Sequence, residues 1–119
     1  MGEHFGSRPA DILAAIGPGI SPCCFETHAD VPDALRAQMG TEAEDFIRAL
    51  PGGEGKFRVD LKGVNSRWLE LAGVPSEHIS ICTACTACDL DTFWSHRIQG
   101  QARGSMAAMI QLSREADIL

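Results

Sequence analysis

Apolar residues fall into short runs along the chain, and the spacing within each run differs. Met1 and Phe5 stand four residues apart before Gly6, which is typical of the last turn of a helix with a glycine stop. Residues 12–16 are all apolar, as expected of a strand that is buried on both faces. Residues 23–27 predict a second extended piece. Residues 56–60 alternate polar with apolar side chains, which predicts a half-exposed strand.

Helix signals lie between these runs. Asp30 is a good N-cap for a helix over residues 31–39, which Gly40 ends. The segment 41–50 has acidic residues in its first turn and apolar residues further on, so it predicts a second helix before the break at residues 51–53. Asp60 predicts the start of a third helix over residues 61–72.

The last third of the chain favours strands. Residues 78–82, 92–97 and 105–112 each have an extended pattern, and a glycine-containing turn predicts that the last two pair in a hairpin. Helices and strands interleave without strict alternation. The expected fold class is therefore α/β or α+β, with a mixed sheet and flanking helices.

Composition narrows the class of protein. The chain has 119 residues, 45% hydrophobic and 22% charged, which predicts one soluble domain over residues 1–119. Its net charge of −6 repels phosphate backbones and anionic lipids, so we expect it to bind neither nucleic acid nor a membrane. No apolar run approaches the ~20 residues of a membrane span, and residues 1–4 lack signal-peptide features. We expect a cytoplasmic protein.

The five cysteines are candidates for metal chemistry. Cys82, Cys85 and Cys88 stand three residues apart, a spacing at which thiolates on a loop can converge on one soft ion. A zinc site needs a fourth ligand, which His96 or the Cys23-Cys24 pair would have to supply from a distance. The alternative is a surface loop in which cysteine is a small apolar residue.

Two further groups have alternative interpretations. Ser95 and His96 are of the residue types that form a nucleophile–base dyad. As neighbours on an expected strand, however, their side chains would point to opposite faces and could not form one. Glycines and prolines in residues 17–22 predict a rigid loop whose backbone can approach a ligand closely, or simply a tight turn between strands. Neither group identifies a catalytic residue.

Several stretches together resemble one known family. They are Ile16-Gly17-Pro18-Gly19-Ile20-Ser21-Pro22-Cys23-Cys24-Phe25-Glu26, Asp60 with Asn65, Cys82-Thr83, Phe93-Trp94-Ser95-His96-Arg97 and Arg103-Gly104-Ser105-Met106-Ala107-Ala108. From about residue 1 to residue 112 the chain is similar to the laccase-domain proteins, also called polyphenol oxidases or peptidoglycan editing factors. The resemblance implies a laccase-domain-like α/β fold and purine nucleoside phosphorylase activity, with adenosine deaminase and methylthioadenosine phosphorylase activity.

The family is described as using a zinc ion held by two histidines and a cysteine, and an older label makes it a copper oxidase. Those ligands lie in His-Gly, Asp-Cys and His-Ala-Gly-Trp-Arg-Gly segments, which nothing in this chain matches. The resemblance therefore covers only the C-terminal half of the domain. It carries over no metal ligand and no catalytic residue, and we expect neither zinc nor copper to be bound by this chain alone.

What the resemblance assigns is a substrate pocket for a purine nucleoside and phosphate. Its expected residues are Gly17, Pro18, Gly19, Ile20, Phe25, Ser95, His96 and Arg97. Without the metal half we expect little or no catalysis, from a fragment or the product of a split gene. The alternative is a non-catalytic binding or self-assembling module, paired with a second copy or with a separate N-terminal half.

Overall fold

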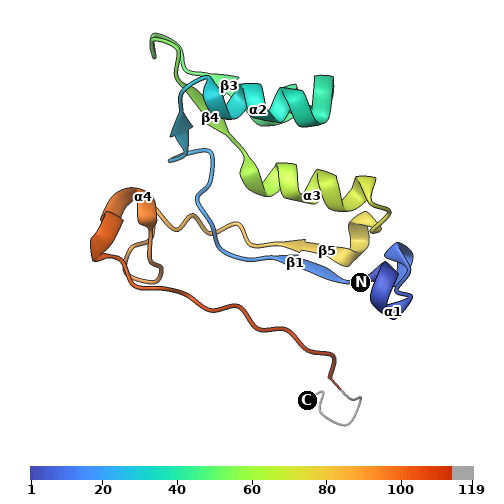
Figure 1. The fold of residues 1–119 in the computed structure, drawn as a ribbon. Coiled ribbons are helices and arrows are strands. Elements are labelled where there is room, and N and C mark those ends of the chain that lie inside the picture. The colour runs from blue at the N-terminus through green and yellow to red at the C-terminus, as the bar shows by residue number, and fades with distance from the viewer. Residues whose placement is uncertain (114–119) are drawn as a thin grey trace.

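The computed structural model describes residues 1–113, which form two small β-sheets and the helices that flank them (Figure 1). The first sheet is parallel and consists of β1 (Ala14–Ile16) beside β5 (Ile79–Ile81). The second is antiparallel and has the order β2-β4-β3, with bounds Glu26–Thr27 for β2, Phe57–Val59 for β4 and Ile47–Ala49 for β3. The mixed α/β class is thus confirmed, although the strands form two sheets rather than one.

The helices are short. The α-helices are α1 (Gly2–Phe5), α2 (Asp30–Met39), α3 (Leu61–Leu71) and α4 (His96–Gln99). Short 3₁₀ helices lie at Pro9–Asp11, Gly40–Phe46, Ser76–His78 and Gly100–Ala102. None of the helices within residues 1–113 is long and apolar enough to cross a membrane.

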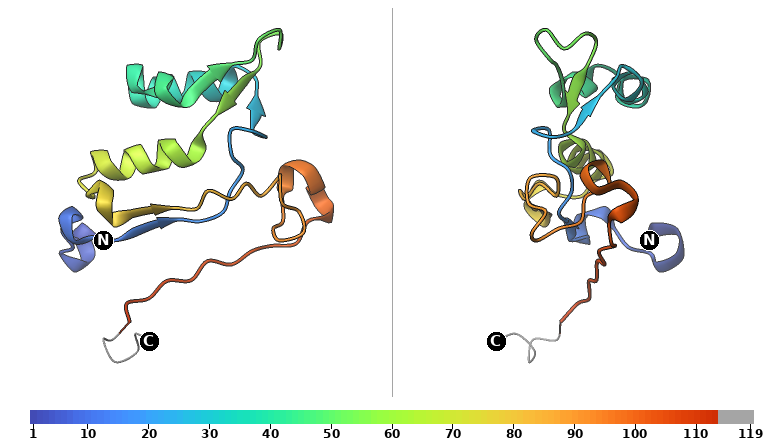
Figure 2. Two further views of the ribbon diagram at one scale, coloured as in Figure 1. Left: turned by 180° about the vertical axis from the view of Figure 1, so that it is seen from behind. Right: turned by 90° about the vertical axis from the view of Figure 1, so that its left-hand side faces the viewer.

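The core lies between α2, α3 and the antiparallel sheet, which stack against one another in both views of Figure 2. Its buried residues are Leu35, Ala43, Ile47, Val59 and Val64. In α3, Asp60 caps the first turn as expected, because its Oδ1 accepts a hydrogen bond from the N–H of Gly63 at 3.0 Å. This cap fixes where α3 leaves β4 and thereby orients the helix toward the parallel sheet.

Three local expectations for the first half are wrong. Residues 47–49 are a strand rather than part of a helix, because Ile47 pairs with Val59 across the β3–β4 hairpin. Asp30 is the first residue of α2 and no side chain caps that helix, whose N-cap is Ala29. β1 is not buried on both faces, since Ala15 is exposed where only β5 stands beside the strand.

The expected hairpin at residues 92–112 is also wrong. Residues 96–99 form α4, because the Ser95 hydroxyl accepts a hydrogen bond from the N–H of Ile98 and caps the helix. The segment 103–113 has no regular structure and runs in an extended path below the parallel sheet (Figure 1). The sequence of this segment favours a strand, but no strand among residues 1–113 lies beside it, so no hydrogen-bonded pairing forms.

Candidate functional site

A cavity of about 300 Å³ opens where the loop after β1, the loop after β5 and the start of α4 meet. It is lined by Pro18, Gly19, Ile20, Phe25, Thr86, Trp94, Ser95, His96, Arg97 and Met106. Every position expected to bind substrate lines this cavity except Gly17, which adjoins it in the chain. The structure thus brings together two segments that are about 70 residues apart in sequence.

The loop after β1 forms one wall and is held by backbone contacts. The pairing of the parallel sheet continues past its end, since the N–H of Cys82 donates to the carbonyl of Ile16 at 2.8 Å. Further on, the N–H of Thr86 donates to the carbonyl of Gly19 at 3.1 Å. The two loops therefore run side by side and place the backbone of residues 18–20 at the cavity.

Arg97 ties the start of α4 to this wall. Its Nη1 donates to the backbone carbonyl of Glu26 at 2.6 Å, and its guanidinium carbon lies 5.0 Å from the centroid of the Phe25 ring. The residue is nevertheless exposed, so its remaining N–H groups are available to an anion. Arg97 is therefore the cation of this cavity.

Ser95 and His96 have different places from those expected. Ser95 is 3% exposed, and its hydroxyl is the α4 cap rather than a free nucleophile. Its N–H also donates to Oε1 of Gln99 at 2.8 Å. His96 is the exposed first residue of α4, so the pair sits at a helix start and not on a strand. The expectation that Ser95 and His96 lie on a strand is thus wrong. The hydrogen bonds of Ser95 show that its role is to cap α4.

Lys62 is a site residue that the sequence did not indicate. The side chain is buried, with 8% exposure, and its Nζ donates to Ser21 Oγ at 3.2 Å. It also donates to the carbonyls of Cys82 at 2.9 Å and Ala84 at 2.6 Å. Lys62 therefore joins α3 to both loops behind the cavity. Helical spacing alone gave no signal, because the contacts come from loops distant in sequence.

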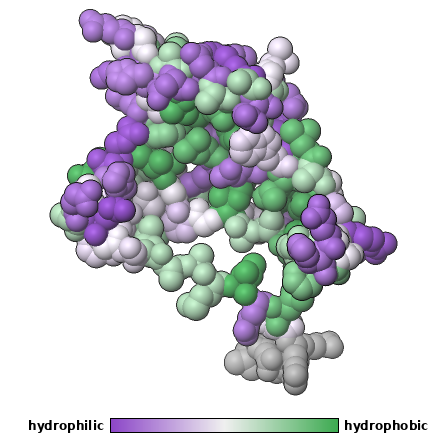
Figure 3. Space-filling view, viewed as in Figure 1, coloured by the Kyte–Doolittle hydropathy of each residue, from purple (hydrophilic) through white to green (hydrophobic). Residues whose placement is uncertain are grey.

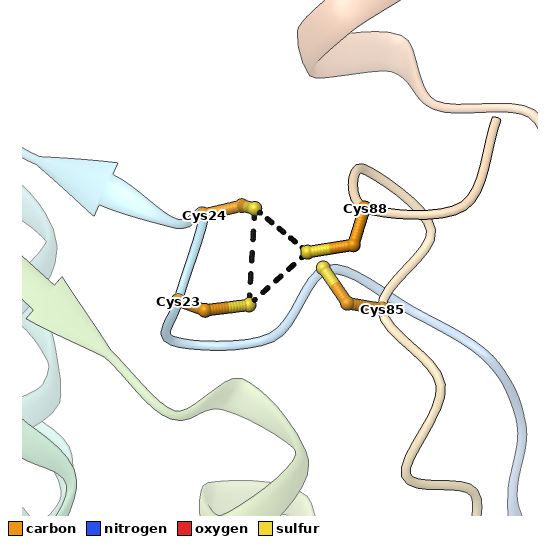
Figure 4. Close-up of side chains that lie close together, drawn as sticks. All are labelled: Cys23, Cys24, Cys85 and Cys88. Carbon is orange, nitrogen blue, oxygen red and sulfur yellow. Dashed lines mark hydrogen bonds between the residues drawn. The ribbon is translucent and has the colours of Figure 1, made fainter.

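Four of the cysteines converge beside this wall, and we call Cys23, Cys24, Cys85 and Cys88 the thiol cluster. Their Sγ atoms all lie within 4.8 Å of one another, and Figure 4 shows the side chains pointing to one centre from two loops. The expected set is partly wrong, because Cys82 lies outside it and the Cys23-Cys24 pair completes it. The N–H of Cys82 still pairs with β1, before the chain turns. The three cysteines spaced evenly in the sequence therefore do not lie together in the fold.

The thiols of the cluster differ in acidity. Burial alone raises the pKa of Cys85, the buried member. Backbone N–H groups of Ser21, Cys88 and Ala87 outweigh burial and lower this pKa to about 6. Hydrogen bonding to Cys88 raises the pKa of Cys23. Cys85 therefore loses its proton at a lower pH than Cys23 does.

The thiol cluster is a set of donors that can hold a metal ion. It does not fit the histidine-containing centre that the family resemblance implies. Among residues 1–113, no histidine joins a cysteine in a group of metal-ligating side chains. The expectation that this chain supplies none of the family's metal ligands stays a prediction, and the cluster is a different arrangement.

Comparisons with known proteins place the chain in a family. A family model described as multi-copper polyphenol oxidoreductase laccase matches residues 1–113. The purine nucleoside phosphorylase YlmD of Geobacillus stearothermophilus is 40% identical over 111 residues, covering 91% of this chain and 38% of that protein. The adenosine deaminase RL5 of an unknown prokaryotic organism is 34% identical over 95 residues, covering 80% of this chain and 36% of that protein.

A solved structure gives the same answer for the fold. The crystal structure of YlmD from Geobacillus stearothermophilus superposes with a TM-score of 0.73 at 38% identity, covering 81% of this chain and 35% of that chain. The chain therefore spans little more than a third of the length of the relatives it matches. It belongs to the laccase-domain family, whose matching model is that of the multi-copper polyphenol oxidoreductase laccases.

Proposed function

We propose that this chain forms the C-terminal, substrate-pocket part of a laccase-domain purine nucleoside phosphorylase or adenosine deaminase. The observation that carries the proposal is the cavity between residues 18–25 and 94–97. Relatives named for these two activities support it, since each aligns with most of this chain. The ligands proposed for the cavity are a purine nucleoside and phosphate.

The lining of the cavity suits those ligands. Trp94 is 44% exposed and offers a ring face on which a purine can stack. Gly19 and Ile20 of the loop line the cavity, and their backbone N–H groups are proposed to bond a ligand there. Arg97 supplies a positive charge for phosphate. The volume of about 300 Å³ is at the small end for a small-molecule site, as expected of one wall of a pocket.

We propose that this chain binds the substrate and that the rest of the domain carries out the catalytic steps. The family resemblance implies a zinc ion, which would supply Lewis acidity or activate a bound water, and we propose that the rest of the domain holds it. The residues of this chain bind and orient the nucleoside. The 119-residue chain alone is therefore expected to release little or no hypoxanthine from inosine with phosphate.

Nucleoside binding can be followed through Trp94. The chain has two tryptophans, so a Trp68→Phe variant leaves Trp94 as the only indole. Inosine is expected to quench its fluorescence to a saturable limit, because the purine stacks on the ring. With phosphate present, Arg97→Ala in the same background is expected to weaken the apparent affinity about tenfold, the loss of one charged hydrogen bond.

Arg48→Ala is the matched control, since Arg48 is an exposed arginine of β3 outside the cavity lining. It is expected to leave the titration unchanged. Quenching that stays linear in inosine, or that falls equally in both arginine variants, contradicts the proposed pocket. Steady release of hypoxanthine by the pure chain contradicts the division of labour instead.

A second candidate is a non-catalytic assembly module, which the exposed apolar surface favours. Met109, Ile110 and Leu112 are 94%, 81% and 90% exposed on the extended segment. Figure 3 shows apolar side chains along this segment and across the face above it. A cavity of about 600 Å³ separates residues 110–112 from residues 1–13. Such a surface is typical of one that a partner covers.

Under this candidate the chain is expected to elute as a stable dimer whose mass, measured by light scattering, is twice that of the monomer. Ile110→Lys is expected to return it to a monomer, because a charge in an apolar interface is costly. Leu90→Lys places the same change at an exposed leucine outside the segment and is the control. A well-behaved monomer at all concentrations contradicts self-assembly.

A further inference from the structure

The thiol cluster joins two loops that are far apart in the sequence. Cys23 and Cys24 stand between β1 and β2, whereas Cys85 and Cys88 stand in the loop after β5 (Figure 4). The Sγ atom of Cys88 lies 3.5 Å from that of Cys23 and 3.3 Å from that of Cys24. The fold therefore brings a vicinal pair and a Cys-x-x-Cys pair to one point, although neither motif alone predicts a site.

The spacing of the sulfur atoms fits one tetrahedral ion. Zinc–thiolate bonds of about 2.3 Å in a tetrahedron put neighbouring sulfurs about 3.8 Å apart. The shorter separations in the cluster run from 3.3 to 3.8 Å, and all four sulfurs lie within 4.8 Å of one another. Small side-chain rotations therefore suffice to close the shell. A cluster of several irons would need its cysteines spread more widely around it.

The surroundings of the cluster are suited to negative charge. Four thiolates around a divalent cation carry a net negative charge. The N–H of Ser21 donates to the Sγ atom of Cys85 at 3.3 Å, as backbone groups around thiolate metal centres do. Lys62 is buried behind the same loops and forms no ion pair with a carboxylate in the described part of the chain. Its hydrogen bonds go to neutral oxygens of the loops that carry the cluster, so a nearby anionic centre would balance its charge.

We propose that the thiol cluster is a structural zinc site with four cysteine ligands, distinct from the histidine-containing centre of the family. Binding needs no oxidant or reductant: Zn²⁺ forms four bonds to sulfur, and the protons held by the thiols leave to solvent. The shell is closed by four protein ligands, so no position remains for substrate or water. The ion's role is to join the wall of the cavity, residues 17–25, to the loop over residues 82–88.

This role follows from how few contacts join the two loops. Beyond the parallel sheet these contacts are the Gly19–Cys85 bridge, the hydrogen bond from Thr86 to Gly19 and the one from the Ser21 N–H to Cys85 Sγ. Lys62 is the side chain that bonds both loops from behind. Cys23 and Cys88 are exposed, so the open side of the cluster faces solvent and an ion can enter without unfolding. The proposal stands independently of nucleoside binding, because none of the four cysteines lines the cavity.

The test uses the full 119-residue chain, reduced and stripped of metal, then titrated with Co²⁺ and with Zn²⁺. We expect one ion per chain by elemental analysis, and the visible absorption of a tetrahedral cobalt–thiolate centre that Zn²⁺ displaces. Cys88→Ser is the main variant, because this residue is exposed and its loss should leave the fold intact. We expect it to weaken Zn²⁺ binding by at least about 100-fold. Cys82→Ser, at the cysteine outside the cluster, is expected to bind as the unchanged chain does.

Thiol protection gives a second measurement that does not depend on the cobalt spectrum. With Zn²⁺ bound, alkylation is expected to label Cys82 and to spare the four cluster cysteines until a chelator is added. Two outcomes overturn the proposal. They are no stoichiometric binding of either ion, and equal loss of binding in Cys82→Ser and Cys88→Ser.

Discussion

Replacing Lys62 with methionine is expected to lower the free energy of unfolding by about 3 kcal/mol. Methionine keeps the apolar stem but removes the ammonium, whose hydrogen bonds reach Ser21 Oγ and the carbonyls of Cys82 and Ala84. Hydrogen bonds from a charged donor stabilise more than neutral ones, and acceptors left behind in a buried place lose their partner without regaining water. Urea denaturation followed by circular dichroism measures the change.

The chain's other lysine provides the control. Lys56 is exposed before β4, and Lys56→Met is expected to change stability by less than about 0.5 kcal/mol. Lys62→Arg adds a second comparison, because it keeps the charge while changing the shape of the donor. If Lys62→Met is as stable as Lys56→Met, the buried ammonium does not hold the loops together, and its hydrogen bonds contribute nothing net.

Local signals in the sequence predicted the elements that local chemistry fixes. Asp60 starts α3 through its own side chain, and Gly6 and Gly40 end helices with positive φ values of 63° and 64°. β4 was predicted correctly from the alternation at residues 56–60. In each case the deciding hydrogen bond or backbone angle lies within a few residues of the signal.

Elements that depend on a distant partner were predicted less well. Residues 47–49 became a strand because Val59 and its neighbours pair with them, an interaction that outweighs the helical pattern of the segment. Residues 92–97 are an exception among the locally fixed elements, because hydrogen bonds of Ser95 within four residues begin a helix at His96 where the aromatic residues favoured a strand. The antiparallel and parallel strands were expected in one sheet, and nothing in the order of elements separates them into two.

The candidate sites show the same division. The two segments of the cavity came from the family resemblance, and the structure shows that they meet. The thiol cluster combines Cys23 and Cys24 with Cys85 and Cys88. The sequence predicted this pair only as one of two sources of a fourth ligand, because the two loops meet through the β1–β5 pairing, which cysteine spacing does not reveal. Lys62 was missed altogether, since its burial comes from loops that cover one end of α3.

Zinc is expected to stabilise the chain by about 4 kcal/mol when its free concentration is about 1,000 times the dissociation constant. The gain arises because the folded state assembles four thiols at one point, whereas the unfolded chain spreads them over residues 23–88. Urea titrations with and without Zn²⁺, both under reducing conditions, measure it. Cys88→Ser is expected to lose most of the gain, and Cys82→Ser is expected to keep it.

The zinc effect and the Lys62 effect should not be additive, because both act on the same two loops. Lys62 bonds Ser21 on one loop and Ala84 on the other, and the ion bonds cysteines a few residues further along each. In Lys62→Met the ion must order loops that the ammonium no longer holds, so a coupling of about 0.5–3 kcal/mol is expected in a double-mutant cycle with Cys88→Ser. Strict additivity would contradict the expected coupling between the two contacts. An equal zinc gain in Cys88→Ser and the unchanged chain would show that the ion binds elsewhere.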